Sequence, residues 1–119
     1  LDIFDALDAR VAACEAAGIA RDRLCVDPGI GFGKTAAHNT ELLHRLALFH
    51  GLGCPVMVGA SRKSFIARIA GDAPADRRLG GSLAAAVAAL SRGCQILRVH
   101  DVAETRQAAS LASRIAAGR

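Results

Sequence analysis

The stretch Asp-Pro-Gly-Ile-Gly-Phe-Gly-Lys-Thr at residues 27–35 directly follows a short apolar run, Leu-Cys-Val at residues 24–26. Two further polar runs, Gly-Ala-Ser-Arg-Lys-Ser at 59–64 and Arg-Val-His-Asp at 98–101, stand in the same relation to later apolar segments. The apolar runs show little polar alternation, which is typical of parallel strands buried on both faces. Polar residues therefore collect at the carboxyl ends of successive strands, where α/β folds place their active sites.

Apolar residues at helical spacing separate these strands, and glycines mark the ends of the helices. The expected strands are 24–26, 55–58 and 94–99. Helices are expected from the first residues to Gly18, from an N-cap at Asn39 or Thr40 to a stop at Gly51 or Gly53, and over 61–70, 82–92 and 102–117. Asp101 and Glu104 predict a capping box at the start of the last helix. Strand starts about 30 to 40 residues apart are typical of right-handed strand-helix-strand crossovers. The predicted fold class is α/β, with three parallel strands and flanking helices, incomplete as a barrel.

Composition limits the partners of the chain. It has 119 residues, begins at Leu1 with a helix, and is therefore expected to be part of a longer protein. A net charge of +4 is spread along the chain, and four Phe with no Trp or Tyr give little basis for a nucleic-acid partner. No apolar run approaches the roughly 18 residues of a membrane span. Four widely separated cysteines are expected to be buried thiols in a reducing compartment, which predicts a cytoplasmic protein.

The first polar run carries a candidate binding site. The carboxylate of Asp27 offers two oxygens to a flat heterocycle with adjacent N–H and amino donors, or it caps its own loop. Phe32 is either a buried loop anchor or an apolar wall against an aromatic substrate. Lys34 is expected to be a solvated charge. Glycine spacing in this run excludes both the P-loop and the dinucleotide fingerprint.

The second polar run places Lys63 at the start of a predicted helix, where the helix dipole disfavours a cation. A lysine in that place suggests a ligand acceptor or anion. Ser61 and Ser64 offer hydroxyl groups for a carboxylate, with simple N-capping as the alternative. Arg62 is expected to face solvent.

The third polar run places Arg98 and His100 on one face of a strand, because strand side chains alternate. Two such donors form an anion site. The alternative is a surface ion pair between Arg98 and Asp101, with His100 as a loop residue.

Together the three motifs, in this order, resemble the carboxyl-terminal part of dihydropteroate synthase, in the pterin-binding family. The similarity extends from about Ile19 to the end of the chain, and Gly-Gly-Ser at 80–82 also fits the pattern. The resemblance implies that residues 1–119 are the carboxyl-terminal part of a TIM (β/α)8 barrel. It also implies a transferase that joins 6-hydroxymethyl-7,8-dihydropterin pyrophosphate to p-aminobenzoate, the folate-pathway reaction inhibited by sulfonamides.

Residue roles follow from the same resemblance. It implies that Asp27 and Lys63 bind the pterin, and that Arg98 and His100 lie around the pterin and the departing phosphates. Lys63, Arg98 and His100 are therefore the expected catalytic residues. The implied substrate-binding residues are Asp27, Phe32, Gly59, Ser61, Lys63, Ser64, Arg98 and His100. Phe32 and Ser64 correspond to the p-aminobenzoate site, whereas the ligand for Mg²⁺ is expected in an amino-terminal half.

Other functions stay open at this point. One is a pterin-dependent methyltransferase with a related folate-binding barrel. Another is a noncatalytic half-barrel for assembly, since an exposed sheet edge invites pairing with a second chain, including a homo-oligomer. Because the resemblance places further pterin ligands and two loops in an amino-terminal half, the 119 residues alone are predicted to be inactive.

Overall fold

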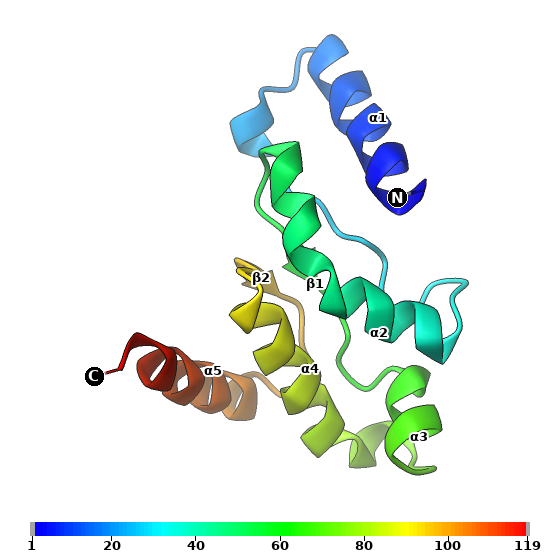
Figure 1. The fold of residues 1–119 in the computed structure, drawn as a ribbon, viewed down its shortest axis with the longest axis vertical. Helices are drawn as coiled ribbons and strands as arrows, with labels where there is room; N and C mark the ends of the chain where they lie inside the picture. Colours follow the sequence, from blue (N-terminus) through cyan, green and yellow to red (C-terminus); the bar gives the residue numbers. More distant parts are fainter. Residues whose placement is uncertain (1, 119) are drawn as a thin grey trace.

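The computed structural model describes residues 2–118. Its elements, with η for a 3-10 helix, are α1 (Asp2–Ala16), η1 (Arg21–Arg23), α2 (Ala36–His44), η2 (Leu46–Leu52), β1 (Met57–Val58), α3 (Ser64–Ala70), η3 (Ala75–Arg77), α4 (Leu79–Ser91), β2 (Ile96–Leu97) and α5 (Val102–Ala117). Helix α4 packs against α5 and also contacts α2 and α3, whereas α1 contacts η2 at the other end of the molecule (Figure 1). Helices thus alternate with extended segments, which confirms the α/β class.

The sheet is shorter than predicted. Strands β1 and β2 pair in parallel over two residues each, with Val58 beside Leu97. The expected first strand is reduced to a single parallel bridge between Val26 and Val56. A 3-10 turn precedes this segment and Pro28, which cannot donate to a ladder, follows it. The prediction of three regular strands is therefore wrong, although three parallel segments do lie side by side.

The core lies around these segments and the helices behind them. Val56, Leu46 and Ile30 are fully buried, and Leu52 and Val58 are nearly so. Ile96 in β2, by contrast, is 40% exposed. The apolar runs predict strands buried on both faces, and this prediction is wrong for the last strand.

Helix ends depart from prediction where a side chain finds another partner. Helix α2 begins at Ala36, because the Thr35 hydroxyl accepts a bond from the backbone N–H of His38 at 3.1 Å. Asn39, expected at the N-cap, therefore lies inside the helix. The segment 61–63, expected to be helical, precedes α3 as loop. Helix α5 has the predicted bounds, but the Asp101 side chain makes no capping bond, so the capping box is wrong.

Two findings bear on setting. Within residues 2–118 no helix has the length and apolar character needed to cross a membrane. All four cysteines are free thiols; Cys54 and Cys94 are buried, Cys14 is partly buried and Cys25 is exposed. The expectation of four buried thiols is thus wrong for Cys25.

Candidate functional site

Residues 27–35, here called the glycine loop, follow the bridge at Val26. Gly29, Gly31 and Gly33 all have positive φ, at 77°, 89° and 62°, a region that side chains disfavour. Asp27 accepts a bond from the backbone N–H of Gly29 at 2.8 Å through Oδ1. The capping role that was the alternative for Asp27 is therefore present, and it uses one carboxylate oxygen.

Two side chains hold the glycine loop in place: Lys34 belongs to the loop, and Asn39 lies in helix α2 beside it. Nζ of Lys34 donates to the carbonyl oxygens of Gly29 at 2.7 Å and Phe32 at 3.0 Å. The backbone N–H of Gly31 donates to Oδ1 of Asn39 at 2.7 Å, and Asn39 is only 2% exposed. Lys34 is thus not the solvated charge that we expected. One feature of the sequence could have indicated this role of Asn39. It lies four residues after Thr35, in the first turn of a helix that borders the loop.

Lys63 reaches across from the second polar run to the same loop. Its Nζ donates to the carbonyl oxygen of Ile30 and lies 4.4 Å from the centroid of the Phe32 ring. A Cβ on Gly31 would lie 2.7 Å from Cδ of Lys63, so the lysine stem passes where only glycine leaves room. The glycine at position 31 therefore permits both the turn and the approach of the lysine.

Charged residues from two segments, the glycine loop and the third polar run, act on Lys63. Burial lowers the pKa of its ammonium, the Asp27 carboxylate opposes that shift, and the Arg98 guanidinium adds to it. Lys34 lowers the pKa of Lys63 further. Such effects require proximity. The Asp27 carboxylate and the Arg98 guanidinium therefore have opposite effects on the charge of Lys63.

Phe32 is 72% exposed. This exposure excludes the reading in which its ring anchors the loop in the core. The ring stands over the Lys63 ammonium at the surface, and the reading as an apolar wall stays a prediction.

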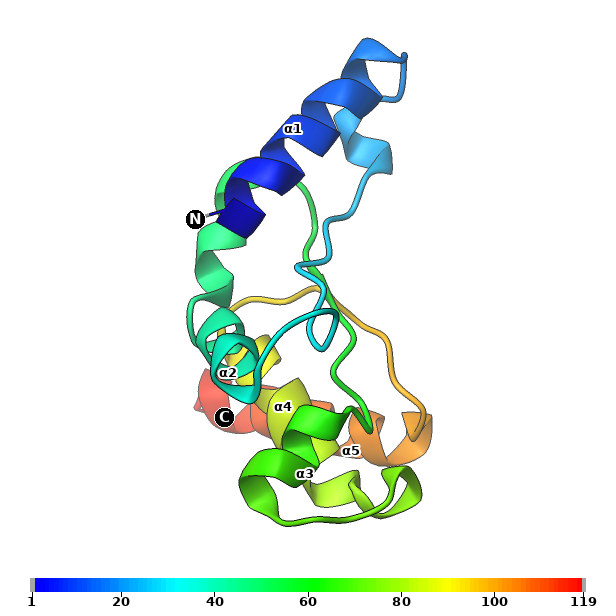
Figure 2. The ribbon, with the colours of Figure 1, turned by 90° about the vertical axis from the view of Figure 1, so that its right-hand side faces the viewer.

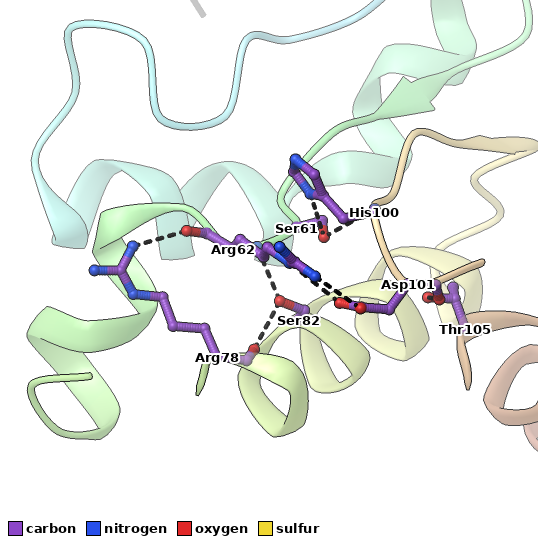
Figure 3. A network of polar contacts seen from close by, with 7 residues as sticks. All are labelled: Ser61, Arg62, Arg78, Ser82, His100, Asp101 and Thr105. Atoms are coloured by element: carbon purple, nitrogen blue, oxygen red, sulfur yellow. Dashed lines mark hydrogen bonds and ion pairs between the residues drawn. The ribbon is translucent and has the colours of Figure 1, made fainter. Parts of the chain in front are cut away.

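Residues 59–63 and 98–101, here called the paired loops, run side by side past the ends of β1 and β2. Gly59 lies beside Arg98, whose Cβ is 3.7 Å from the position of a Cβ on Gly59. Nδ1 of His100 and Oγ of Ser61 are 2.9 Å apart, and the backbone N–H of His100 donates to the same oxygen at 3.3 Å (Figure 3). The Ser61 hydroxyl therefore holds His100 and does not cap α3.

Arg62 does not face solvent as expected. Its guanidinium binds the Asp101 carboxylate through Nη2 at 2.9 Å and Nε at 3.3 Å (Figure 3). The hydrogen bond from Arg62 holds the pKa of Asp101 below its usual value. The alternative pairing of Arg98 with Asp101 is therefore wrong: Asp101 is engaged by Arg62, and Arg98 and His100 are exposed.

Ser64 is the first residue of α3 and is exposed. Because it lies inside the helix and Lys63 occupies the N-cap position, N-capping does not explain Ser64 either. Two hollows lie elsewhere, one among α2, α3 and α4 and one between α1 and α2. Neither is lined by Asp27, Lys63 or Arg98. Over residues 2–118, no three side chains among His, Cys, Asp and Glu gather as a metal site.

This arrangement offers an ammonium, a guanidinium and an imidazole at the carboxyl ends of adjacent segments, together with a carboxylate. Such a surface suits a ligand that carries a donor-rich ring and an anionic group. Figure 2 shows the turn of the glycine loop beside the segment that leads into α3. The pattern of three polar runs therefore describes a real cluster.

Comparisons with known proteins give the family to which the chain is similar. The family model of pterin-binding enzymes matches residues 2–100. The dihydropteroate synthase of Escherichia coli K12 is 52% identical over 99 residues, which is 83% of this chain and 35% of that protein. The chain thus spans about a third of the length of the curated relatives it matches.

Solved structures show the same likeness. The dihydropteroate synthase of Xanthomonas albilineans in complex with 7,8-dihydropteroate has a TM-score of 0.95 and 42% identity, and the match covers 98% of this chain and 44% of that chain. The Yersinia pestis enzyme in a sulfonamide drug complex has a TM-score of 0.94 and 42% identity, with 99% of this chain and 43% of that chain covered. On these grounds the chain belongs to the family of pterin-binding enzymes.

Proposed function

We propose that the chain forms the carboxyl-terminal part of a dihydropteroate synthase barrel in the cytoplasm. Such an enzyme condenses 6-hydroxymethyl-7,8-dihydropterin pyrophosphate with p-aminobenzoate to give 7,8-dihydropteroate and pyrophosphate. The observation that carries the proposal is the contact of the Lys63 side chain with the glycine loop, where its Nζ donates to Ile30 and lies over the Phe32 ring. Relatives solved with dihydropteroate and with 4-aminobenzoic acid support the choice of substrates.

In this proposal Asp27 and Lys63 recognise the pterin. The Asp27 carboxylate accepts hydrogen bonds from the ring N–H and the amino group, and the Gly29 N–H orients it through Oδ1. The Lys63 ammonium donates to the ring carbonyl and nitrogen acceptors. Its bond to Ile30 and its contact with Phe32 already fix its direction.

Arg98 and His100 receive the departing pyrophosphate. Negative charge builds on this group as its C–O bond breaks, and fixed donors lower the barrier most when they are aimed at that charge. The amine of p-aminobenzoate then forms the new C–N bond at the methylene carbon and releases a proton. Orientation and charge stabilisation supply the rate, and no covalent nucleophile takes part.

Phe32, Ser64 and Gly59 complete the substrate contacts. The exposed Phe32 ring faces the aromatic ring of p-aminobenzoate, and the exposed Ser64 hydroxyl binds its carboxylate. Gly59 leaves space beside Arg98. Residues 2–118 hold no group of three His, Cys, Asp or Glu side chains that could bind Mg²⁺, and its ligand would lie in an amino-terminal half.

Calorimetric titration with the dihydropterin pyrophosphate tests this function. Asp27→Asn and Lys63→Ala are each expected to weaken binding by at least about tenfold, since each removes a charged hydrogen bond. Asp22→Asn, in the exposed turn η1, is the matched control and is expected to bind like the parent chain. No heat with the parent chain would instead favour the assembly module, which analytical ultracentrifugation would reveal as a stable oligomer.

A coupled assay for dihydropteroate addresses activity. We expect no turnover from the 119 residues alone, because they span about a third of their relatives' length. Turnover near that of a complete synthase would contradict this expectation. Binding of a methyl-folate in preference to the pterin pyrophosphate would favour the methyltransferase alternative.

A further inference from the structure

The parallel register of the sheet continues beyond its backbone ladder through side chains. Partners in β1 and β2 are 39 residues apart, and the same step joins Ser61 to His100 and Arg62 to Asp101. Side-chain bonds thus hold the paired loops in the register that the strands begin. A loop pair tied at successive positions is more rigid than two independent loops.

Arg62 is the residue of the paired loops whose backbone is most constrained. It has φ of 60°, and in residues 2–118 it is the only residue other than glycine with positive φ. An L-amino acid adopts this region at a cost and keeps it when its surroundings fix it. The cause here is a set of contacts that hold both the backbone and the side chain of Arg62.

Three partners make these contacts (Figure 3). The Arg62 backbone N–H donates to Oγ of Ser82 at 2.9 Å, and its carbonyl oxygen accepts from Nη1 of Arg78 at 2.7 Å. Ser82 in turn donates to the carbonyl oxygen of Arg78 at 2.7 Å. Asp101 holds the guanidinium. The start of α4 and the N-cap residue of α5 therefore both bind one residue of the loop after β1.

The left-handed turn at Arg62 sends its two neighbours in different directions. Ser61, before it, binds the ring of His100. Lys63, after it, reaches the glycine loop at Ile30. The conformation of Arg62 thus sets the arrangement of the two groups that flank the expected position of an anionic ligand.

We propose that Arg62 is a positioning residue. Through its ion pair with Asp101 it holds the Ser61–His100 pair and Lys63 in the arrangement that receives a pyrophosphate group, an inference that rests on the proposed function above. Arg62 itself touches no reacting atom in this role. Its effect passes through His100 and Lys63.

Two single variants and the double variant distinguish a role of Arg62 in positioning His100 and Lys63 from a role in the stability of the fold alone. Asp101→Asn removes the charge of the pair and keeps its shape. Arg62→Gly removes the guanidinium and also relieves the positive φ, so its unfolding midpoint in urea is expected to equal or exceed that of Asp101→Asn. The matched control is Glu15→Gln, which changes the Arg21–Glu15 ion pair of 2.7 Å on the far side of the chain.

The full chain is titrated with inorganic pyrophosphate, and amide hydrogen exchange is read by NMR at Arg62 and His100. Asp101→Asn and Arg62→Gly are each expected to weaken pyrophosphate binding about threefold to tenfold. Asp101→Asn is also expected to speed exchange of both amides by a similar factor. The double variant loses no more affinity than either single variant, because one ion pair is removed in each case. Glu15→Gln leaves affinity and exchange at these amides unchanged.

Wild-type affinity in both single variants, or losses that multiply in the double variant, would overturn the positioning role. If the parent chain does not bind pyrophosphate, the proposed function is contradicted, and amide exchange alone judges Arg62. Faster exchange at His100 in Asp101→Asn then still supports the positioning role of Arg62, whereas unchanged exchange rejects it.

Discussion

The glycine loop and the paired loops meet at Lys63, but they are held in different ways. Bonds that hold the glycine loop join residues two, five and eight positions apart: Gly29 to Asp27, Lys34 to Gly29, and Gly31 to Asn39 in the following helix. Bonds between the paired loops join residues 39 positions apart. The first region is therefore organised by local sequence and the second by the pairing of distant segments. Substitutions that act on one region and spare the other test this difference.

The largest effect is expected where the paired loops rest on packed helices. A Cβ on Gly81 in α4 would lie 2.2 Å from Cγ2 of Ile66 in α3, so Gly81→Ala should lower the unfolding free energy by about 1–3 kcal/mol. A Cβ on its neighbour Gly80 would meet no atom within 4 Å, so Gly80→Ala should raise it by about 0.5–1 kcal/mol. Urea denaturation measures both. Equal effects at the two positions would show that α3 and α4 do not approach closely.

The next largest effect is expected from removing the buried side-chain amide of Asn39, which holds the glycine loop. Asn39→Ala leaves the Gly31 N–H without its acceptor and should lower the unfolding free energy by about 1–2 kcal/mol. Thr40→Ala is the control, because its exposed hydroxyl bonds only to carbonyl oxygens of its own helix. It should change stability by less than about 0.5 kcal/mol. Rapid amide exchange at Gly31 in Asn39→Ala alone would locate the damage in the loop.

A smaller loss is expected in the paired loops from Ser82→Ala. The Arg62 N–H loses its acceptor, which should lower the unfolding free energy by about 1 kcal/mol. Ser91→Ala, on the same helix, removes only a bond to Ala88 and serves as the control. If the two variants are equally stable, Arg62 does not depend on α4 for its conformation.

The smallest effect concerns pH, at the junction of the two regions. Burial holds the pKa of Lys63 in the folded chain below the 10.5 of a free side chain. At pH values between these two pKa values the unfolded chain therefore binds more protons than the folded chain. The unfolding free energy contributed by Lys63 therefore rises with pH up to about 10.5. Lys63→Met should remove this rise. Urea denaturation of both proteins between about pH 8 and 10.5 gives the slope of unfolding free energy against pH for each. Cys94 titrates in both proteins, so its contribution cancels in the difference between the two slopes.

The same contrast explains what the sequence predicted. Motifs placed Asp27, Lys63 and Arg98 at strand ends, because alternating apolar and polar runs encode the topology. In the structure Lys63 contacts the glycine loop that begins at Asp27, and Arg98 lies beside Gly59. Helix α5 matched its predicted bounds because its periodicity is local. The role of Arg62 was missed, since its partner Asp101 is far along the chain and equally suited to cap a helix.

Errors in the glycine loop have another cause. Lys34 and Asn39 are residues that solvent or a helix cap satisfies equally well, so their type alone does not reveal a loop carbonyl or amide as partner. Strand lengths were overestimated because apolar runs report burial, whereas a ladder also requires matching backbone on the neighbouring segment. The roles of Ser64 and Phe32 toward a substrate stay predictions.

The uneven exposure of the cysteines provides a chemical reporter of the sheet. Cys25 is exposed two residues before Asp27, whereas burial raises the pKa of the Cys94 thiol, whose Sγ donates to carbonyl oxygens of Val56 and Ile96. Because thiolates are the reactive form, a thiol-specific label should modify Cys25 quickly and Cys94 only when β1 and β2 separate. The labelling rate of Cys94 in the absence of any ligand would then measure how often β1 and β2 separate.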